Sequence, residues 1–173
     1  MTITKQNFGR IKAALIFLTP IIVLIASTVL FYSGFSPDGK TNNGILFEPP
    51  VELNDLNFSV SSGPLTKEFP GRWTIVHLLN DTCSENCWKT LYSTRQVNVR
   101  LAKNSSRVVR YLLLTENTKL TEKDLKKLAS EYPMLNLGEV KFENLPHEAK
   151  DGLPYNPYIL FDPLGNGVLM YDV

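Results

Sequence analysis

The sequence is poor in the residues from which many common sites are built. Its 173 residues include two cysteines and two histidines, and 18 lysines and arginines are balanced by 17 aspartates and glutamates. Two cysteines are too few for a framework of several disulfides. A net charge of +1 argues against a nucleic-acid-binding domain, because a surface that follows phosphates is normally strongly basic. No Gly-rich phosphate loop, paired carboxylates or Ser/His/Asp arrangement stands out either.

One long apolar run near the start of the chain is present instead. Residues 13–35 contain no charged side chain, and about 20 apolar residues in a helix span the hydrocarbon core of a bilayer. We therefore predict a transmembrane anchor over 13–35. Lys5, Arg10 and Lys12 lie in residues 1–12, so the positive-inside rule places this N-terminus in the cytoplasm and the rest of the chain across the membrane. A cleaved signal peptide is the alternative, although its apolar region is normally shorter.

The exported part divides into a tether and a domain. Residues 36–70 start with a polar, turn-rich stretch and continue with a segment that Pro49 and Pro50 keep extended rather than helical. From residue 71 onward, hydrophobic patterns predict one α/β domain, 71–173. Residues 121–132 have helical spacing, and Thr121 with Asp124 predicts a capping box at the start of this helix. Four short apolar runs predict strands at 73–79, 107–114, 158–162 and 167–171.

The two cysteines follow the first of these strands. We expect Asp81 or Thr82 to cap a helix that carries Cys83 and Cys87 in its opening turn. Strand, helix and second strand then form a βαβ unit, which places the pair at the carboxyl end of a parallel strand. Residues four apart in a helix have Cα atoms about 6 Å apart, which is within reach of a disulfide.

Several kinds of chemistry are open to this pair. A helix N-terminus favours a thiolate, so in a redox role we expect Cys83 to attack and Cys87 to resolve. Two sulfurs are also half of a soft-metal site for copper(I) or zinc, which needs at least one further ligand. A structural disulfide that closes so short a loop stabilises little, and two idle thiols are the remaining alternative.

The other chemistry-bearing residues have plainer interpretations. His77 lies in an apolar strand, where a buried, hydrogen-bonded histidine is expected. His147 lies in a polar loop, where we expect an exposed side chain rather than a ligand. Six lysines and arginines between Lys89 and Arg110 indicate the solvated face of a helix, with docking onto an acidic partner as the alternative.

Taken together, these motifs resemble a known group. The single anchor, the C-x3-C pair, and the stretches 42-NNGILFEPP-50, 95-RQVNVRLAK-103 and 158-YILFDPLGN-166 are similar to Sco/SenC-like thioredoxin-fold proteins, in particular the small membrane-anchored proteins of bacterial cytochrome oxidase gene clusters. The resemblance implies a thioredoxin-like domain in the periplasm, anchored in the bacterial inner membrane. It also implies a role in assembly of cytochrome c oxidase, with an oxidase subunit or assembly factor as partner.

Two positions of this sequence depart from the copper-carrying members. Those members bind metal through both cysteines and a histidine. The histidine lies just before the hairpin that the last two predicted strands form, where this chain has Pro154. His147 lies several residues earlier, and it would have to join Cys83 and Cys87 to complete a copper(I) site. Classical thioredoxins instead place a cis-proline before this strand, and Pro157 matches it by spacing.

The resemblance therefore favours thiol–disulfide exchange, in which Cys83, Cys87 and Pro157 are the expected catalytic residues of an oxidoreductase. A copper(I) carrier that uses the same cysteines is the first alternative. The second is a non-catalytic protein that associates with the oxidase through its anchor and residues 44–56. The family fold usually has one more helix after the hairpin. We therefore expect that an earlier segment or a partner covers that face of the sheet, or that this chain is a short version of the fold.

Overall fold

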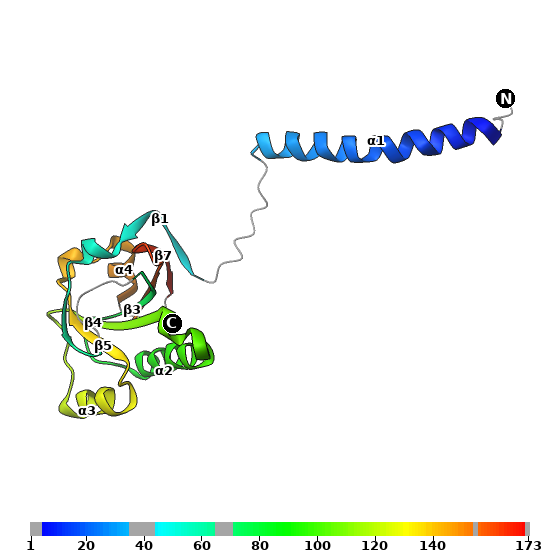
Figure 1. Cartoon of the computed structure of the whole chain (residues 1–173). Helices are drawn as coiled ribbons and strands as arrows, with labels where there is room; N and C mark the ends of the chain where they lie inside the picture. The colour runs from blue at the N-terminus through cyan, green and yellow to red at the C-terminus, as the bar shows by residue number, and fades with distance from the viewer. Residues whose placement is uncertain (1–4, 35–43, 65–70, 154–155, 172–173) are drawn as a thin grey trace. The chain divides into compact units, whose positions relative to one another are not determined.

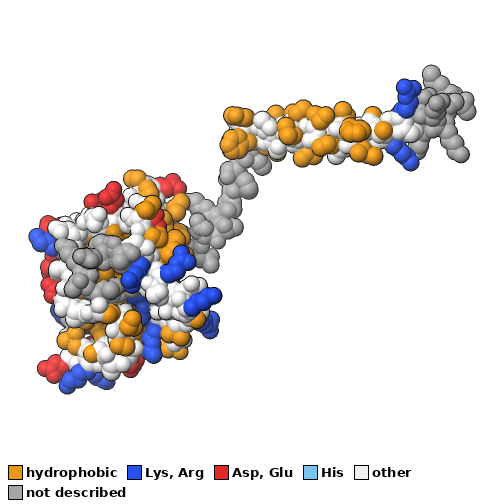
Figure 2. Space-filling model, in the orientation of Figure 1, with side chains coloured by type: hydrophobic (Ala, Val, Ile, Leu, Met, Phe, Trp, Pro, Cys, Tyr) orange, Lys and Arg blue, Asp and Glu red, His pale blue; other side chains and the backbone are white. Residues whose placement is uncertain are grey.

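The apolar run near the start of the chain forms helix α1 (Lys5–Tyr32). In the computed structural model, residues 5–34, 44–64, 71–153 and 156–171 are described. Gly9–Tyr32 is long and apolar enough to cross a membrane, and none of it is buried in the protein. Figure 2 shows its surface covered by hydrophobic side chains. Residues 1–41 and 42–173 are separate compact units, so α1 is a candidate membrane anchor for an independent domain.

Seven strands of the described residues form one mixed sheet in the order β1-β7-β6-β3-β4-β5-β2 (Figure 1). β3, β4 and β5 are parallel neighbours, whereas β6 and β7 form an antiparallel hairpin against β3. The strands are β1 (Ile45–Glu52), β2 (Ser59–Ser62), β3 (Trp73–Leu79), β4 (Val108–Leu114), β5 (Leu135–Glu139), β6 (Tyr158–Phe161) and β7 (Asn166–Tyr171). The βαβ unit and the hairpin expected from the sequence are confirmed.

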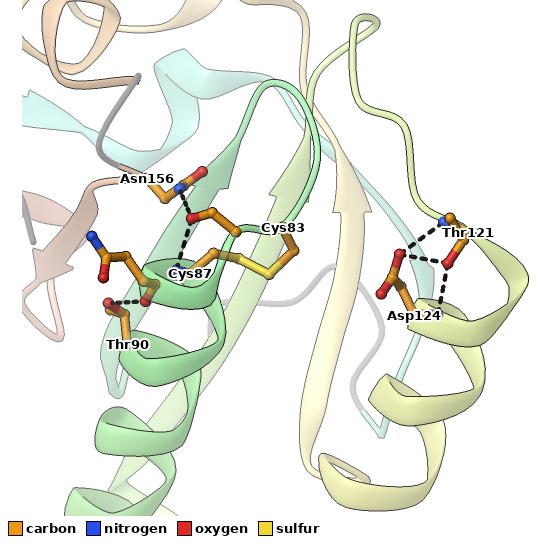
Figure 3. Close-up of a disulfide and its surroundings, with 8 residues drawn as sticks. Cys83, Cys87, Thr90, Thr121, Asp124 and Asn156 are labelled. Atoms are coloured by element: carbon orange, nitrogen blue, oxygen red, sulfur yellow. Dashed lines mark hydrogen bonds between the residues drawn. A yellow bond between two sulfur atoms is a disulfide. The ribbon is translucent and has the colours of Figure 1, made fainter.

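Helices α2 (Glu85–Arg100) and α3 (Glu122–Glu131) pack on one face of the sheet (Figure 1). Their core with β3 and β4 includes Leu79, Leu91, Leu112 and Leu128. The predicted capping box of α3 is present, because Thr121 and Asp124 exchange side-chain and backbone hydrogen bonds (Figure 3). These hydrogen bonds lower the pKa of Asp124, since they favour its charged form.

The opposite face is covered by short segments of the same domain. The 3-10 helix η1 (Leu53–Leu56) and helix α4 (His147–Gly152) pack there, through side chains such as Leu56 and Ala149 that are completely buried. The 3-10 helices η2 (Ala102–Arg107) and η3 (Phe142–Asn144) complete the described elements.

The sheet is larger than the sequence patterns indicated. β1 and β2 come from residues 36–70, which we had assigned to a tether and an extended segment, and they pair with β7 and β5 at the two edges. β5 was not predicted, because LNLGE is short and contains a glycine. That glycine has a role: a Cβ at Gly138 would lie 2.6 Å from the backbone oxygen of Ser59, so its absence lets β2 approach.

Candidate functional site

The cysteine pair straddles the start of α2 rather than sharing its opening turn. Ser84 is the N-cap, so Cys83 lies before the helix and Cys87 is its third residue. The Ser84 hydroxyl accepts the Cys87 backbone N–H at 3.3 Å and so takes the capping role that we had expected of Asp81 or Thr82. The pair is joined by a disulfide, with Cα atoms 5.3 Å apart (Figure 3).

The two sulfur-bearing residues differ in accessibility. Cys87 is 3% exposed and packs in the core between α2 and the sheet, whereas Cys83 is only half-buried against that core. Of the two sulfurs, that of Cys83 is therefore the more accessible to another molecule. The attacking and resolving roles of Cys83 and Cys87 stay a prediction.

A second loop of the domain is hydrogen-bonded to the cysteine loop. Asn156, just before β6, donates from its side-chain amide to the Ser84 hydroxyl at 3.3 Å (Figure 3). Its backbone has φ of +53°, a left-handed conformation that asparagine tolerates better than most residues. One oxygen of Ser84 thus connects the start of α2 with the loop before the hairpin. The sequence offered no signal for this contact, because the two residues are 72 positions apart.

Pro157 lies at the same end of the sheet without the geometry of the classical proline. It is buried, and its carbonyl accepts the Leu78 N–H at 3.0 Å. Among the described residues the cis peptide bond is Glu48–Pro49, so Asn156–Pro157 is trans. Pro154, at the position of the missing histidine, lies outside the described residues.

Hydrogen bonds hold the loop that leads into the cysteine motif. Thr115 donates to the Asn80 side-chain oxygen at 2.7 Å, and Thr118 donates to the Leu79 carbonyl at 2.7 Å. A polar cavity of about 370 Å³ adjoins this loop. Its walls include Asp81, Thr82, Ser84, Phe142, Lys150 and Asn156. The loop after β3 is therefore held by hydrogen bonds and lies beside a cleft that Asp81, Thr82 and Ser84 help to line.

His77 is the buried, hydrogen-bonded histidine that its sequence context predicted. It is 4% exposed, and its Nε2 lies 3.0 Å from the Thr94 hydroxyl. Burial, helped by the nearby charge of Arg110, lowers the pKa of His77 to about 3. The imidazole is thus neutral at physiological pH and has a structural role in packing α2 on β3.

His147 is not brought to the cysteines. It begins α4, its side chain is 87% exposed, and its Nδ1 lies 3.3 Å from a carboxylate oxygen of Asp151. In the described part of the chain, no three His, Cys, Asp or Glu side chains are close enough to hold a metal ion. Cys83, Cys87 and His147 are therefore not grouped together in the described structure.

Comparison with known proteins identifies the fold. Residues 73–173 match the model of a family described as "Transmembrane-like, thioredoxin-like, C-terminal domain". No curated protein matches the chain. Among solved structures, the chain is similar to copper-bound ScoI of Arabidopsis thaliana, with 17% identity over 60% of this chain and 76% of that one and a TM-score of 0.44. A DsbF homologue from Corynebacterium diphtheriae has 8% identity over 79% and 87% of the two chains, with a TM-score of 0.48.

Proposed function

The chain belongs to the transmembrane-like, thioredoxin-like C-terminal domain family, and on this premise we propose that it is a membrane-anchored thiol–disulfide oxidoreductase acting through Cys83 and Cys87. The observation that carries the proposal is the asymmetry of the pair. A half-buried Cys83 is bonded to a fully buried Cys87 at the N-terminus of α2. Unpaired N–H groups at a helix N-terminus favour the thiolate that such exchange requires.

The exchange conserves atoms and electrons without a further cofactor. In the reduced protein the Cys83 thiolate attacks a disulfide of the partner, which forms a Cys83–partner bond and releases one partner thiolate. Cys87 then loses its proton to solvent and attacks Cys83 Sγ, which releases the second partner thiolate. The partner is reduced by two electrons and the Cys83–Cys87 disulfide forms again. A dithiol protein on the same side of the membrane must return the pair to the reduced state.

The partner that we propose is a subunit or assembly factor of cytochrome c oxidase, whose cysteines must be reduced before copper is inserted. This part rests on the sequence resemblance to the small anchored proteins of oxidase gene clusters. The proposal places α1 in the bacterial inner membrane and the domain in the periplasm, in keeping with the positive charges before the apolar run. We propose that the partner's cysteine-containing segment binds in the polar cavity beside Ser84 and Asn156.

The two alternative functions, a copper(I) carrier and a non-catalytic interaction protein, require different features of the cysteine site. A copper(I) carrier needs a third ligand beside the cysteines, which the exposed His147 does not supply in this conformation. A non-catalytic interaction protein needs no reactive cysteine at all. Neither alternative accounts for the unequal accessibility of the pair, so exchange remains the function that we propose.

The decisive experiment is a redox titration of the full-length chain in nanodiscs, followed by tryptophan fluorescence or thiol labelling. We expect a reduction potential in the range of exchange-active pairs, about −120 to −270 mV. A potential below about −300 mV, typical of structural disulfides, would refute the exchange role. A parallel copper(I) titration of the reduced chain tests the carrier role, which requires stoichiometric binding that Cys83→Ser removes.

A further inference from the structure

The strands β1, β7 and β6 are covered unequally on their two faces. On the face where η1 and α4 pack, Phe47, Ile159, Phe161 and Met170 are at most 3% exposed and belong to the core. The side chains that alternate with them point to the other face, where they are half-buried or exposed. These alternating side chains are Leu46, Tyr158, Leu160, Leu169 and Tyr171. One face of this part of the sheet is therefore sealed, whereas the other still contacts water.

The strand register places these side chains on the same side of the sheet as α2. Nε2 of His77 in β3 lies 3.0 Å from the Thr94 hydroxyl of α2, so His77 points toward this helix. Tyr158 is directly opposite His77, and Tyr171 is directly opposite Tyr158. Residues directly opposite each other in a sheet point to the same face. The ring positions agree, since the centroids lie 5.4 Å apart in the first pair and 5.0 Å apart in the second.

The same face continues along these strands and onto the start of β3. Side chains two or four residues apart in a strand point the same way, which adds Leu160 in β6 and Trp73 in β3. Leu169 is opposite Leu160, and Leu46 is opposite Leu169. Leu46 is 48% exposed and Trp73 is 38% exposed. We call this surface the open face; it consists of Leu46, Trp73, Tyr158, Leu160, Leu169 and Tyr171.

The flank of α2 beside the open face carries an exposed valine and an exposed arginine. Cζ of Arg95 lies 5.6 Å from the centroid of the Tyr132 ring, so that flank of α2 faces α3. Val97 is about 200° farther around the helix, on the opposite flank toward β6, and it is 52% exposed. Arg100, nearly one turn after Val97, is also exposed. Apolar surface thus leads from the sheet to a cation on α2.

Other exposed cations follow along α2 and η2, namely Lys89, Lys103 and Arg107. Residues 86–115 contain no aspartate or glutamate. Figure 2 shows several Lys and Arg side chains on the side of the domain where α2 lies. The acidic residues Glu48 and Glu52 belong to β1, at the other border of the open face. The charge beside α2 therefore suits an anionic binding partner.

The membrane anchor keeps this face close to a lipid surface. The candidate span ends at Tyr32 and β1 begins at Ile45, 13 positions later. A fully extended chain advances at most about 3.5 Å per residue, so the start of β1 stays within about 45 Å of the end of α1. Because the domain is tethered, even a weak contact with the bilayer forms at a high effective concentration.

We propose that the open face binds the surface of the membrane in which α1 is anchored, and that the cations beside it contact the phosphates of anionic phospholipids. Trp and Tyr suit this position, because their rings have an apolar body and a polar edge and are enriched at membrane interfaces. Lys and Arg are attracted to the surface of an anionic bilayer. The proposal does not depend on the redox role of the cysteines, since it uses other residues of the domain.

Trp73 is a built-in probe of this contact, because the chain has two tryptophans and neither lies in α1. The full-length chain is placed in nanodiscs of phosphatidylcholine brominated near the headgroup end of one acyl chain, with or without phosphatidylglycerol. In discs that contain phosphatidylglycerol, we expect the brominated lipid to quench the fluorescence of the wild type but not that of Trp73→Phe. The remaining Trp88 is the internal control, since it packs toward α3, with its ring centroid 6.2 Å from that of Tyr132. High salt should weaken the quenching by screening the headgroups.

Matched variants distinguish a specific face from general attraction. Leu46→Glu and Leu125→Glu change the charge equally at positions of similar exposure, 48% and 44%, but Leu125 lies in α3, away from the open face. Leu46→Glu should lower the ratio of bound to unbound domain about tenfold, and Leu125→Glu less than about twofold. Arg100→Gln should lower it about fivefold, whereas Lys126→Gln, exposed on α3, should change it little.

Three results would overturn the proposal. The first is equal quenching of the wild type and Trp73→Phe in every disc. The second is an equal loss of quenching in Leu46→Glu and Leu125→Glu. The third is protection of Trp73 from aqueous acrylamide in discs that hold two chains but not in discs that hold one, without quenching by brominated lipid; this result would assign the open face to a second copy of the chain. Because Trp73 and Leu46 are partly exposed, these substitutions leave the buried core intact.

Discussion

The two ends of the parallel strands differ in how their polar groups are satisfied. At the carboxyl end, side-chain hydrogen bonds form on both sides of the cysteine loop. Thr115 donates to Asn80, and Asn156 donates to Ser84, which also accepts the Cys87 N–H. At the amino end, Nη1 of the buried Arg110 has no hydrogen-bond partner. The first arrangement satisfies its polar groups within the protein. The second leaves part of a buried guanidinium without a partner among the described residues.

The largest expected effect is at the carboxyl end, on activity. Cys83→Ser and Cys87→Ser should each reduce disulfide exchange with a model peptide to background, because each removes one of the two sulfurs of the couple. The two should differ in intermediates: Cys87→Ser should accumulate a mixed disulfide through Cys83, which non-reducing gels detect. Stable trapping by Cys83→Ser instead would reverse the assigned roles.

The second effect concerns His77, which lies in β3 between the two ends. Its pKa of about 3 in the folded state is below the ordinary 6.5, so the unfolded chain takes up a proton first as the pH falls. His77 therefore contributes its full share to the free energy of unfolding above pH 6.5. That contribution should be lost as the pH falls from 6.5 to about 3, by up to about 1.4 kcal/mol per pH unit.

Urea unfolding at several pH values measures this contribution. His77→Gln keeps a polar side chain near Thr94 but does not titrate, so its stability should fall less steeply with acid than that of the wild type. Identical slopes in the two proteins would show that His77 is not the group responsible.

Stability should respond with opposite signs at the two ends. Thr115→Val removes the donor to Asn80 and should lower the free energy of unfolding by about 1–2 kcal/mol. Arg110→Met replaces a buried guanidinium, whose Nη1 has no hydrogen-bond partner, by an apolar chain of similar length, so the free energy of unfolding should be unchanged or up to about 3 kcal/mol higher.

Chemical denaturation of both variants measures the contrast. A loss of stability in Arg110→Met as large as that in Thr115→Val would mean that Arg110 is satisfied in the free protein, and the difference between the ends would disappear.

The smallest effect should come from Asn156. Asn156→Gly keeps access to the left-handed backbone but loses the hydrogen bond to Ser84, whereas Asn156→Ala also adds backbone strain. We expect losses of stability of at most about 1 kcal/mol for glycine and about 1 kcal/mol more for alanine. If the contact also positions the cysteine loop, both variants should shift the reduction potential equally. A shift in the alanine variant alone would assign the effect to strain.

Much of the central fold could be predicted from local patterns. β3 runs over Trp73–Leu79 as expected, and α3 has the expected capping box because the hydrogen bonds that start a helix join residues three positions apart. The thioredoxin-like family suggested by the C-x3-C pair and the hairpin is confirmed. The edge strands β1 and β2 were not anticipated, because their pairing with β7 and β5 depends on partners far along the chain.

In the candidate site, too, some features could be predicted from the local sequence and others could not. The identity of the two cysteines and their position after β3 could be predicted, whereas the helix start at Ser84 could not, since Asp81, Thr82 and Ser84 are all competent caps. The environment of His147 depends on the tertiary structure, which leaves its side chain exposed beside Asp151.

By itself the sequence determined the apolar helix, the alternation of strands and helices, and the cysteine pair after β3, because each depends on residues close together in the chain. Tertiary structure alone decided that Cys87 is buried while Cys83 is only half-buried, that Asn156 reaches Ser84, and that Nη1 of the buried Arg110 has no hydrogen-bond partner. Burial and long-range hydrogen bonds depend on which distant segments pack together, and no local pattern of residues contains that information.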